Sequence, residues 1–410
     1  MFLKPITIFF LSFFLSLYSS TLSGVFAQSK IQYGKWSGSL QLNKETALPF
    51  RMEIEKQQKQ IVFSIHNAEE KIVLNQIEYE NDSVKIDFPN FHSFLKFKVV
   101  SKKLLLGYWK NYNKGNEYKI PFKAVFGSTE NVTSVNNFDF TGRWKTTFDP
   151  KTTDESLAIG VFKSKDSKVT GTFLTETGDY RFLEGNVNGK NFTMSCFDGS
   201  HAFLFSGYLD STATIQGKFY SGKHYSTNWT AAKDSSFQLR NPDSLTYIVK
   251  KEPFAFKMKT LEGKDFVFPN AAFDNKVTIV QIMGTWCPNC MDETKYFNEL
   301  YTKYHSNGLE IIAVGYETPN DFEGQVNKIK LLKERHHLDF HFLVGGSANK
   351  SLASEQFSML NQIMSFPTAI IIGRDGEVKR VHTGFNGPGT GKLYDNYVQE
   401  MDLFIQELLK

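Results

Sequence analysis

Residues 277–290 read VTIVQIMGTWCPNC, an apolar run that leads directly into a Cys-x-x-Cys motif. The apolar part predicts a buried strand, because strands covered on both faces of a sheet are continuously hydrophobic. Pro288 suits the first turn of a helix, where its missing N–H would have had no partner. The run therefore predicts a strand that turns directly into a helix, with Cys287 and Cys290 at the turn.

The position of the two cysteines at the start of a helix favours redox chemistry. Unpaired backbone N–H groups and the positive end of the helix dipole stabilise a thiolate there. A thiol pKa of about 8.5 commonly falls to between about 3.5 and 7.5 in such settings. We therefore expect Cys287 to attack a disulfide. Cys290, one turn later and more buried, is expected to resolve the mixed disulfide.

A zinc site and a permanent disulfide are the alternatives for this motif. A structural zinc site needs a second pair of ligands at matching spacing. The histidine cluster consists of His336, His337 and His341, which fall on an expected helix end and the following strand, far from the motif in sequence. We therefore expect neither a metal nor a cofactor, and favour thiol–disulfide exchange.

Strands and helices alternate on the C-terminal side of the chain. The expected elements are strand 277–284, helix 288–307, strand 309–315, helix 321–336, strand 340–344, helix 353–357, strands 368–373 and 378–383, and helix 394–409. The turn signal Arg374-Asp375-Gly376 joins the last two strands. This order predicts an α/β thioredoxin-like domain over residues 250–410.

The same region resembles the TlpA/ResA-like thiol–disulfide oxidoreductases of the thioredoxin superfamily. The matching elements are Gly284-Thr285-Trp286, the Cys-Pro-Asn-Cys motif, Phe366-Pro367-Thr368, the hairpin at residues 373–377 and Gly384. By this resemblance Pro367 is cis and lies against the active-site sulfurs, and Trp286 covers one side of the site. The implied catalytic set is Cys287, Cys290, Pro367, Trp286 and Glu293.

Two positions bear on proton transfer in this site. Thioredoxin itself has a buried aspartate six residues before its first cysteine, whereas this chain has Gln281, which cannot titrate. Glu293 matches a position where the TlpA/ResA-like proteins often carry an acid. Its i, i+3 spacing from Cys290 places it near the resolving thiol. Glu293 is therefore a candidate proton acceptor, and a solvated helix charge is the alternative.

Two β-rich segments, residues 28–130 and 138–235, precede this domain and share landmarks at nearly one offset. The pairs are Gly34-Lys35-Trp36 with Gly142-Arg143-Trp144, residues 92–95 with 201–204, Gly107 with Gly217, and residues 121–124 with 228–231. A repeated domain is the simplest account. Each copy alternates with period 2 between Gly and Asn turns, which predicts an up-and-down barrel or sandwich. The opening Gly-x-Trp resembles the start of lipocalin-like barrels.

Three roles are open for these repeats. They could present substrate proteins to Cys287, hold a small apolar ligand, or be purely structural with interiors filled by their own side chains. Filled interiors are usual in small barrels, which makes the structural role the default. Cys196 in the second repeat is expected to be a buried, inert strand residue.

The first residues predict export. Lys4 precedes an apolar run from Ile6 to Leu17, and Val25-Phe26-Ala27 supplies a cleavage site. We expect a signal peptide over residues 1–27 that is cleaved, with an uncleaved membrane anchor as the alternative. The net charge of +4 is spread without a basic tract, so nucleic acid is not expected as a partner.

The chain is thus expected to be multidomain and periplasmic, with two antiparallel β-rich repeats and a redox domain. The resemblance implies reduction of disulfides in exported proteins, fed by a membrane thiol–disulfide electron donor. A disulfide isomerase or oxidant is one alternative. The other is a ligand- or partner-binding protein whose redox domain is regulatory.

Overall fold

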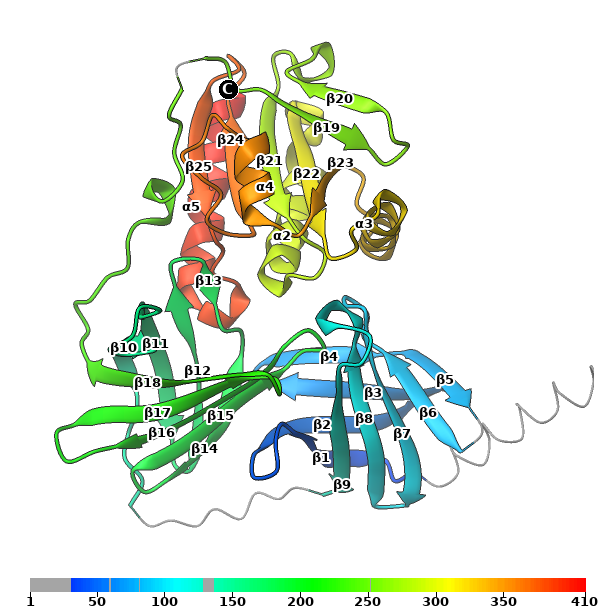
Figure 1. The fold of residues 1–410 in the computed structure, drawn as a ribbon, viewed down its shortest axis with the longest axis vertical. Coiled ribbons are helices and arrows are strands. Elements are labelled where there is room, and N and C mark those ends of the chain that lie inside the picture. Colours follow the sequence, from blue (N-terminus) through cyan, green and yellow to red (C-terminus); the bar gives the residue numbers. More distant parts are fainter. Residues whose placement is uncertain (1–30, 59, 81, 128–135, 251) are drawn as a thin grey trace, which may run out of the picture. The chain divides into compact units, whose positions relative to one another are not determined.

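The computed structural model describes residues 31–58, 60–80, 82–127, 136–250 and 252–410, which form three sheets (Figure 1). The expected signal peptide lies outside the described residues. The chain divides into two compact units. The first comprises Met1–Asn131, Ser195–Leu204 and Tyr220–Tyr225, and the second comprises Val132–Met194, Phe205–Phe219 and Ser226–Lys410. The proposed boundaries of the three domains stay a prediction.

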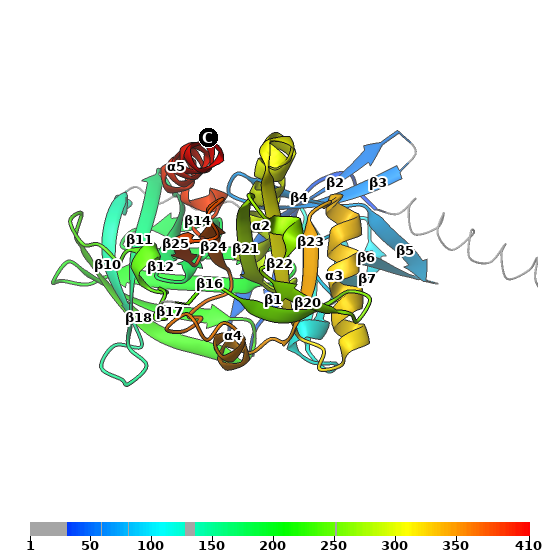
Figure 2. The ribbon, with the colours of Figure 1, turned by 90° about the horizontal axis from the view of Figure 1, so that it is seen from above.

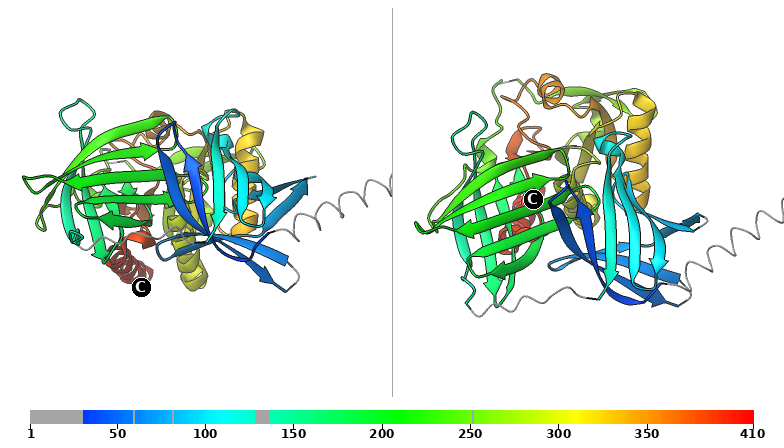
Figure 3. Two further views of the ribbon diagram at one scale, coloured as in Figure 1. Left: turned by 90° about the horizontal axis from the view of Figure 1, so that it is seen from below. Right: turned by 60° about the horizontal axis from the view of Figure 1, so that its bottom comes forward.

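The first sheet is an antiparallel meander in the order β4-β3-β2-β1-β9-β8-β7-β6-β5, coloured blue to cyan in Figure 3. Its strands are β1 (Gly34–Gln41), β2 (Ala47–Gln57), β3 (Gln60–Asn67), β4 (Glu70–Leu74), β5 (Gln76–Glu80), β6 (Ser83–Asp87), β7 (Ser93–Ser101), β8 (Leu104–Asn111) and β9 (Lys119–Phe126). Among the described residues no pairing joins β4 to β5, so this sheet is open.

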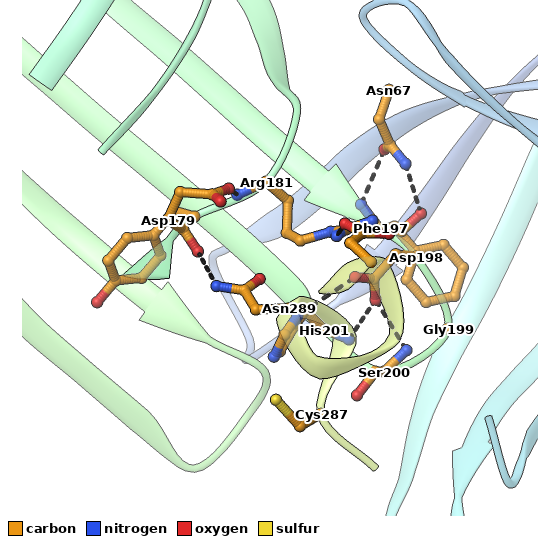
Figure 4. Close-up of polar contacts among 12 residues, drawn as sticks. Asn67, Asp179, Arg181, Phe197, Asp198, Gly199, Ser200, His201, Cys287 and Asn289 are labelled. Atoms are coloured by element: carbon orange, nitrogen blue, oxygen red, sulfur yellow. Dashed lines mark hydrogen bonds and ion pairs between the residues drawn. The ribbon is translucent and has the colours of Figure 1, made fainter. Parts of the chain in front are cut away.

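The core of the first unit is aromatic and includes residues from a distant part of the chain. Trp36, Phe97 and Trp109 are buried together with Phe197 in one apolar cluster. The side chain of Asn67 holds Phe197 in place, accepting from its backbone N–H at 3.0 Å and donating to its carbonyl at 3.1 Å (Figure 4). The segment Ser195–Leu204 therefore belongs to this core.

The second sheet closes on itself. Its strands are β10 (Gly142–Phe148), β11 (Ser156–Lys165), β12 (Lys168–Thr175), β13 (Gly178–Asp179), β14 (Leu183–Asn188), β15 (Asn191–Phe197), β16 (Ala202–Leu209), β17 (Thr214–Ser221) and β18 (Tyr225–Lys233). They follow the order β11-β10-β18-β17-β16-β15-β14-β12-β13, and β11 also pairs with β12. That extra pairing turns the sheet into a barrel, drawn in teal to green in Figure 3.

Aromatic rings fill the interior of this barrel. Phe148, Phe173, Phe205, Phe219 and Trp229 are all buried, and the rings of Phe205 and Phe219 stack with centroids 4.3 Å apart. Such pairs contribute stabilisation beyond their buried area. The chain contains 39 phenylalanines, and several of them pack together in this interior.

The two sheets open with the same local structure. The indole N–H of Trp36 donates to the carbonyl of Gln32 at 3.0 Å, and that of Trp144 donates to the carbonyl of Phe140 at 2.9 Å. Each acceptor lies four residues before its tryptophan. Both sheets are barrel-like and β-rich, as expected, while their lipocalin-like character and their origin as repeats stay predictions.

The third sheet has the order β20-β19-β23-β22-β21-β24-β25. Its strands are β19 (Phe256–Thr260), β20 (Asp265–Phe268), β21 (Val277–Met283), β22 (Leu309–Glu317), β23 (His341–Ser347), β24 (Thr368–Ile372) and β25 (Val378–Thr383). Its helices are α2 (Pro288–Tyr304), α3 (Phe322–His336), α4 (Lys350–Gln356) and α5 (Lys392–Leu409). The strands β21, β22 and β23 run parallel, and β24 and β25 run antiparallel to them. This arrangement confirms the thioredoxin-like expectation.

Helices cover both faces of the third sheet. Tyr296 in α2 donates from its hydroxyl to the carbonyl of Val398 in α5 at 3.1 Å, so these two helices lie side by side. Figure 2 shows α4 on the opposite face. None of the described helices is both long and apolar enough to cross a membrane.

The hairpin of β19 and β20 was not expected from the sequence. Its strands are only five and four residues long, which is too short for a period-2 pattern to stand out in the sequence. Tertiary packing stabilises it, since Phe256 stacks on Phe268 with ring centroids 5.2 Å apart and also contacts Phe357.

Candidate active site

Cys287 is the N-cap residue of helix α2. The backbone N–H of Cys290 donates to Sγ of Cys287 at 3.2 Å, and the carbonyl of Cys287 accepts from the N–H of Met291 at 3.1 Å. Cys287 is 7% exposed and Cys290 is fully buried. An N–H aimed at the sulfur stabilises a thiolate on Cys287, and the order of burial is the one expected for an attacking and a resolving cysteine.

The peptide bond between Phe366 and Pro367 is cis, as the resemblance implied. The carbonyl oxygen of Phe366 lies 3.5 Å from Sγ of Cys287. Trp286 donates from its indole N–H to the carbonyl of Tyr316 at 2.9 Å and meets the ring of Phe366 edge-on. The fold thus brings Trp286, Cys287 and the Phe366–Pro367 bond together, although strands β22 and β23 separate them in the chain.

Glu293 is a buried residue of α2, so the alternative of a solvated helix charge is wrong. Its Oε2 accepts from Nε2 of Gln281 at 2.8 Å, and its Oε1 has no hydrogen-bond partner among the described residues. Burial raises the pKa of Glu293 to about 8, and the Gln281 bond opposes this only in part. A carboxyl group of this kind can take up or release a proton near neutral pH.

Gln281 connects Glu293 to the resolving cysteine. Its Oε1 accepts from the hydroxyl of Thr294 at 3.0 Å, which orients the amide. Its Nε2 also lies 3.5 Å from the carbonyl of Cys290. Gln281, which stands in place of thioredoxin's aspartate, therefore does not titrate, but it positions the carboxyl group of Glu293, which does.

Glu317, at the end of β22, is a site residue that sequence reasoning missed. Its carboxylate accepts from the backbone N–H of Thr285 at 2.9 Å and from the Thr285 hydroxyl at 2.6 Å. Burial raises the pKa of Glu317 to about 7. One feature of the sequence could have indicated Glu317. It ends a strand that runs parallel to β21, and the cysteine motif follows the carboxyl end of β21, so both lie at the same edge of the sheet. Glu317 fixes the turn that leads into Trp286 and Cys287.

Sequence reasoning also missed Asp179 and Arg181, which lie between β12 and β14. The side-chain amide of Asn289, the third residue of the Cys-Pro-Asn-Cys motif, donates to the carbonyl of Asp179 at 3.3 Å. Arg181 forms an ion pair with Asp292 of helix α2. Figure 4 shows Asp179 and Arg181 beside Asn289, with Cys287 at the start of the same helix. These contacts join positions about 110 residues apart, which no local pattern could have revealed.

The histidine cluster lies away from the motif. His336 and His337 end helix α3, and His341 starts β23. Since β21 and β23 run parallel to β22, His341 is at the amino end of strands whose carboxyl end leads to Cys287. Over the part of the chain that the structure describes, no three His, Cys, Asp or Glu side chains gather in a manner suited to a metal ion. Cys196 is a buried residue of β15 in the first unit.

Comparison with known proteins agrees with this geometry. Residues 250–397 match the Redoxin family. The thiol-disulfide oxidoreductase ResA of Geobacillus thermodenitrificans is 30% identical over 131 residues, which cover 32% of this chain and 66% of that protein. The sporulation thiol-disulfide oxidoreductase A of Bacillus subtilis is 25% identical over 149 residues, or 36% of this chain and 80% of that one. The solved structure of StoA from Bacillus subtilis shares 22% identity over 36% of this chain and 98% of its own, with a TM-score of 0.26.

The C-terminal part of this chain is therefore similar to the Redoxin family over residues 250–397. The curated relatives that this region matches are named thiol-disulfide oxidoreductases. The resemblance to TlpA/ResA-like proteins is confirmed for this part of the chain, which spans just under two thirds of the length of the ResA proteins it matches.

Proposed function

We propose that this protein is an exported, periplasmic thiol–disulfide oxidoreductase that reduces disulfides in other exported proteins. The observation that carries the proposal is the N–H of Cys290 donating to Sγ of Cys287 at a helix N-terminus. That arrangement favours a thiolate on Cys287, which is the reactive form of a thiol in disulfide exchange.

The proposed reaction has two exchange steps. The Cys287 thiolate attacks one sulfur of a substrate disulfide, which breaks that bond, forms a mixed disulfide and releases the first substrate thiolate. The Cys290 thiolate then attacks Sγ of Cys287 and releases the second substrate thiolate. Two electrons pass to the substrate, and a Cys287–Cys290 disulfide remains. A membrane dithiol electron donor restores the reduced pair.

The other members of the site have distinct proposed roles. In its ionised form, which a pKa of about 8 keeps accessible near neutral pH, Glu293 takes the proton of the Cys290 thiol, and it follows Cys290 by three residues. Phe366 and Pro367 contact the substrate backbone beside Cys287, and Trp286 covers the opposite side. Glu317 positions the turn before Trp286.

The direction of electron flow is decided by the reduction potential. We would equilibrate the mature protein in graded thiol–disulfide buffers and quantify the Cys287–Cys290 disulfide. A potential near or below about −250 mV supports a reductase, since thioredoxin lies in that range. A potential above about −180 mV belongs to isomerases and oxidants and would overturn the proposed direction.

For the β-rich region we propose a structural role with a contribution to substrate access. The aromatic interior of the second barrel supports this role, because its side chains occupy the space that an apolar ligand would need. Native mass spectrometry of the full chain tests the ligand alternative. A small molecule that stays bound under gentle ionisation would favour that alternative over the structural role.

A further inference from the structure

Residues 177–181 of the second barrel, here called the covering segment, lie against the redox site. The segment includes β13 and belongs to the same compact unit as the C-terminal domain. It contacts the start of helix α2 and the loops that flank β24 and β25, the elements that surround Cys287. A part of the chain outside the Redoxin domain thus reaches the reacting sulfur's immediate surroundings.

The first contact is on the cis-proline side of Cys287. The hydroxyl of Ser365 lies between two acceptors that share its single proton, the carbonyl of Thr177 at 3.2 Å and the carbonyl of Phe366 at 3.1 Å. The Phe366 carbonyl is the one that lies 3.5 Å from Sγ of Cys287. One buried serine therefore joins the covering segment to the oxygen that faces the nucleophile.

The second contact is on the cysteine motif itself. The amide Nδ2 of Asn289 lies 3.3 Å from the carbonyl of Asp179 and 3.3 Å from that of Phe385. Asn289 stands between the two cysteines in sequence, so this bond places the backbone of the covering segment beside the cysteine motif (Figure 4).

Two charged side chains anchor the segment. Oδ2 of Asp179 accepts from the backbone N–H of Gly387 at 2.6 Å, and its Oδ1 accepts from the N–H of Arg181 at 2.6 Å. Arg181 pairs with Asp292, and their side chains are 7% and 10% exposed. Breaking a buried ion pair on one side is strongly unfavourable, so the Arg181–Asp292 pair holds the segment in place. Asp179 holds it through the bond that it accepts from Gly387.

The approach of the backbones is close enough to require glycine. A Cβ on Gly384, where φ is +78°, would lie 2.7 Å from the carbonyl carbon of Thr177. A Cβ on Gly178, where φ is +141°, would lie 2.3 Å from Nδ2 of Asn289. Both positions therefore require glycine, because the covering segment packs closely against the loops around the site.

We propose that the covering segment, held by Asp179 and Arg181, is a specificity element that restricts which disulfides reach Cys287. Small or flexible disulfides enter beside the closed segment, whereas a disulfide within a folded protein needs the segment displaced from Ser365 and Asn289. This proposal rests on the proposed disulfide reduction. The substrate part that displaces the covering segment is an extended peptide that flanks a disulfide and takes the place of residues 177–179.

A single-turnover comparison tests this. The reduced full-length protein is mixed with glutathione disulfide or with insulin, and no further reductant is present, so each Cys287–Cys290 pair reduces one disulfide. Arg181→Gln and Asp179→Asn should raise the ratio of the insulin rate to the glutathione disulfide rate about tenfold. Each variant weakens the anchoring of the covering segment, so the form in which the segment is displaced from Ser365 and Asn289 becomes more populated. Arg181→Lys keeps the charge opposite Asp292 and should restore most of the wild-type ratio.

The matched control is Lys257→Gln, which removes an exposed ion pair with Asp265 in the β19–β20 hairpin. Its ratio should equal the wild-type ratio. If Arg181→Gln and Asp179→Asn also keep the wild-type ratio, the covering role is overturned while disulfide reduction stands. If the wild-type protein reduces neither disulfide, the proposed function itself fails.

A second measurement does not depend on the anchoring variants. Cys290→Ser traps mixed disulfides at Cys287, one with glutathione and one with an insulin chain. Hydrogen exchange of residues 177–181 and of the Gly387 amide should stay slow in the glutathione adduct and accelerate in the insulin adduct. Equal exchange in the two adducts would show that the segment does not move for protein substrates, and would overturn the proposal.

Discussion

Gln281 donates a hydrogen bond of 2.8 Å to Glu293, and both side chains are completely removed from solvent. The acceptor is a carboxyl group whose pKa burial raises to about 8. A single neutral amide is a weak partner for a buried charge, so Glu293 is protonated in the folded protein at pH 7 and ionised in the unfolded chain. This difference makes folding stability depend on pH.

The first prediction concerns that dependence. Between pH 5 and pH 8 the unfolded state binds fewer protons than the folded state at Glu293, so stability falls as pH rises. Glu293→Gln removes this group's contribution, on the order of 3 kcal/mol over that interval. Urea unfolding of the reduced proteins at several pH values should show the variant gaining stability relative to wild type as pH increases.

The control for this experiment is Glu299→Gln, the same substitution on an exposed position of the same helix. It should follow the wild-type pH dependence. A parallel pH dependence of Glu293→Gln and wild type would mean that burial does not raise the pKa of Glu293, and the argument that this pKa suits it to exchange a proton with Cys290 near neutral pH would be lost.

The second prediction separates the roles of the cysteines. Cys287→Ser should abolish disulfide reduction, because no thiolate remains at the helix N-terminus. Cys290→Ser should stop turnover but accumulate mixed disulfides, visible as adducts of increased mass that a thiol reductant removes. Cys196→Ala, the third cysteine, should keep wild-type turnover. Trapping through Cys290 in a Cys287→Ser protein would reverse the assignment.

The third prediction concerns Glu317. Glu317→Ala leaves the buried N–H and hydroxyl of Thr285 without their acceptor, which should lower the free energy of unfolding by about 2 kcal/mol. The turn before Cys287 should loosen as well, and the rate of Cys287 alkylation should change. Glu355→Ala, on an exposed position of α4, serves as the comparison. It should change neither the free energy of unfolding nor the rate of Cys287 alkylation. An unchanged alkylation rate in folded Glu317→Ala would limit Glu317 to a purely stabilising role.

The fourth prediction tests the equivalence of the two β-rich segments. Trp36→Phe and Trp144→Phe each remove one indole hydrogen bond to a carbonyl four residues earlier and reduce a fully packed side chain. Both should destabilise the protein by a similar amount, about 1–3 kcal/mol. Thermal unfolding followed by tryptophan fluorescence measures this. A large loss for one variant and none for the other would argue against equivalent positions.

Local patterns were sufficient for the elements that hold the cysteine motif, although they missed the β19–β20 hairpin of the same domain. The apolar run before Cys287, proline after it and the hydrophobic period of the next helix each depend on residues close in sequence, and they predicted the strand, the helix and the N-cap position. The structure changed only details of these elements. Helix α2, for example, ends at Tyr304 and continues as a short 3-10 turn to Asn307.

The resemblance added what spacing could not. Pro367 lies 80 residues after Cys287, and only the match to known motifs indicated that the two would meet. The sequence alone did not decide whether Glu293 is buried, because a single acidic residue on a helix is equally compatible with a solvated position. Its environment depends on Gln281, which is on the neighbouring strand.

By itself, the sequence determined that the two cysteines lie at the junction of a buried strand and a helix, because a strand, a Cys-x-x-Cys motif and a helix follow one another without a break. Only the tertiary structure decided what surrounds that junction. The pairing of β11 with β12, the bond from Glu317 to Thr285 and the ion pair of Arg181 with Asp292 join distant positions. Such contacts form when whole elements pack, and no short window of residues contains both partners.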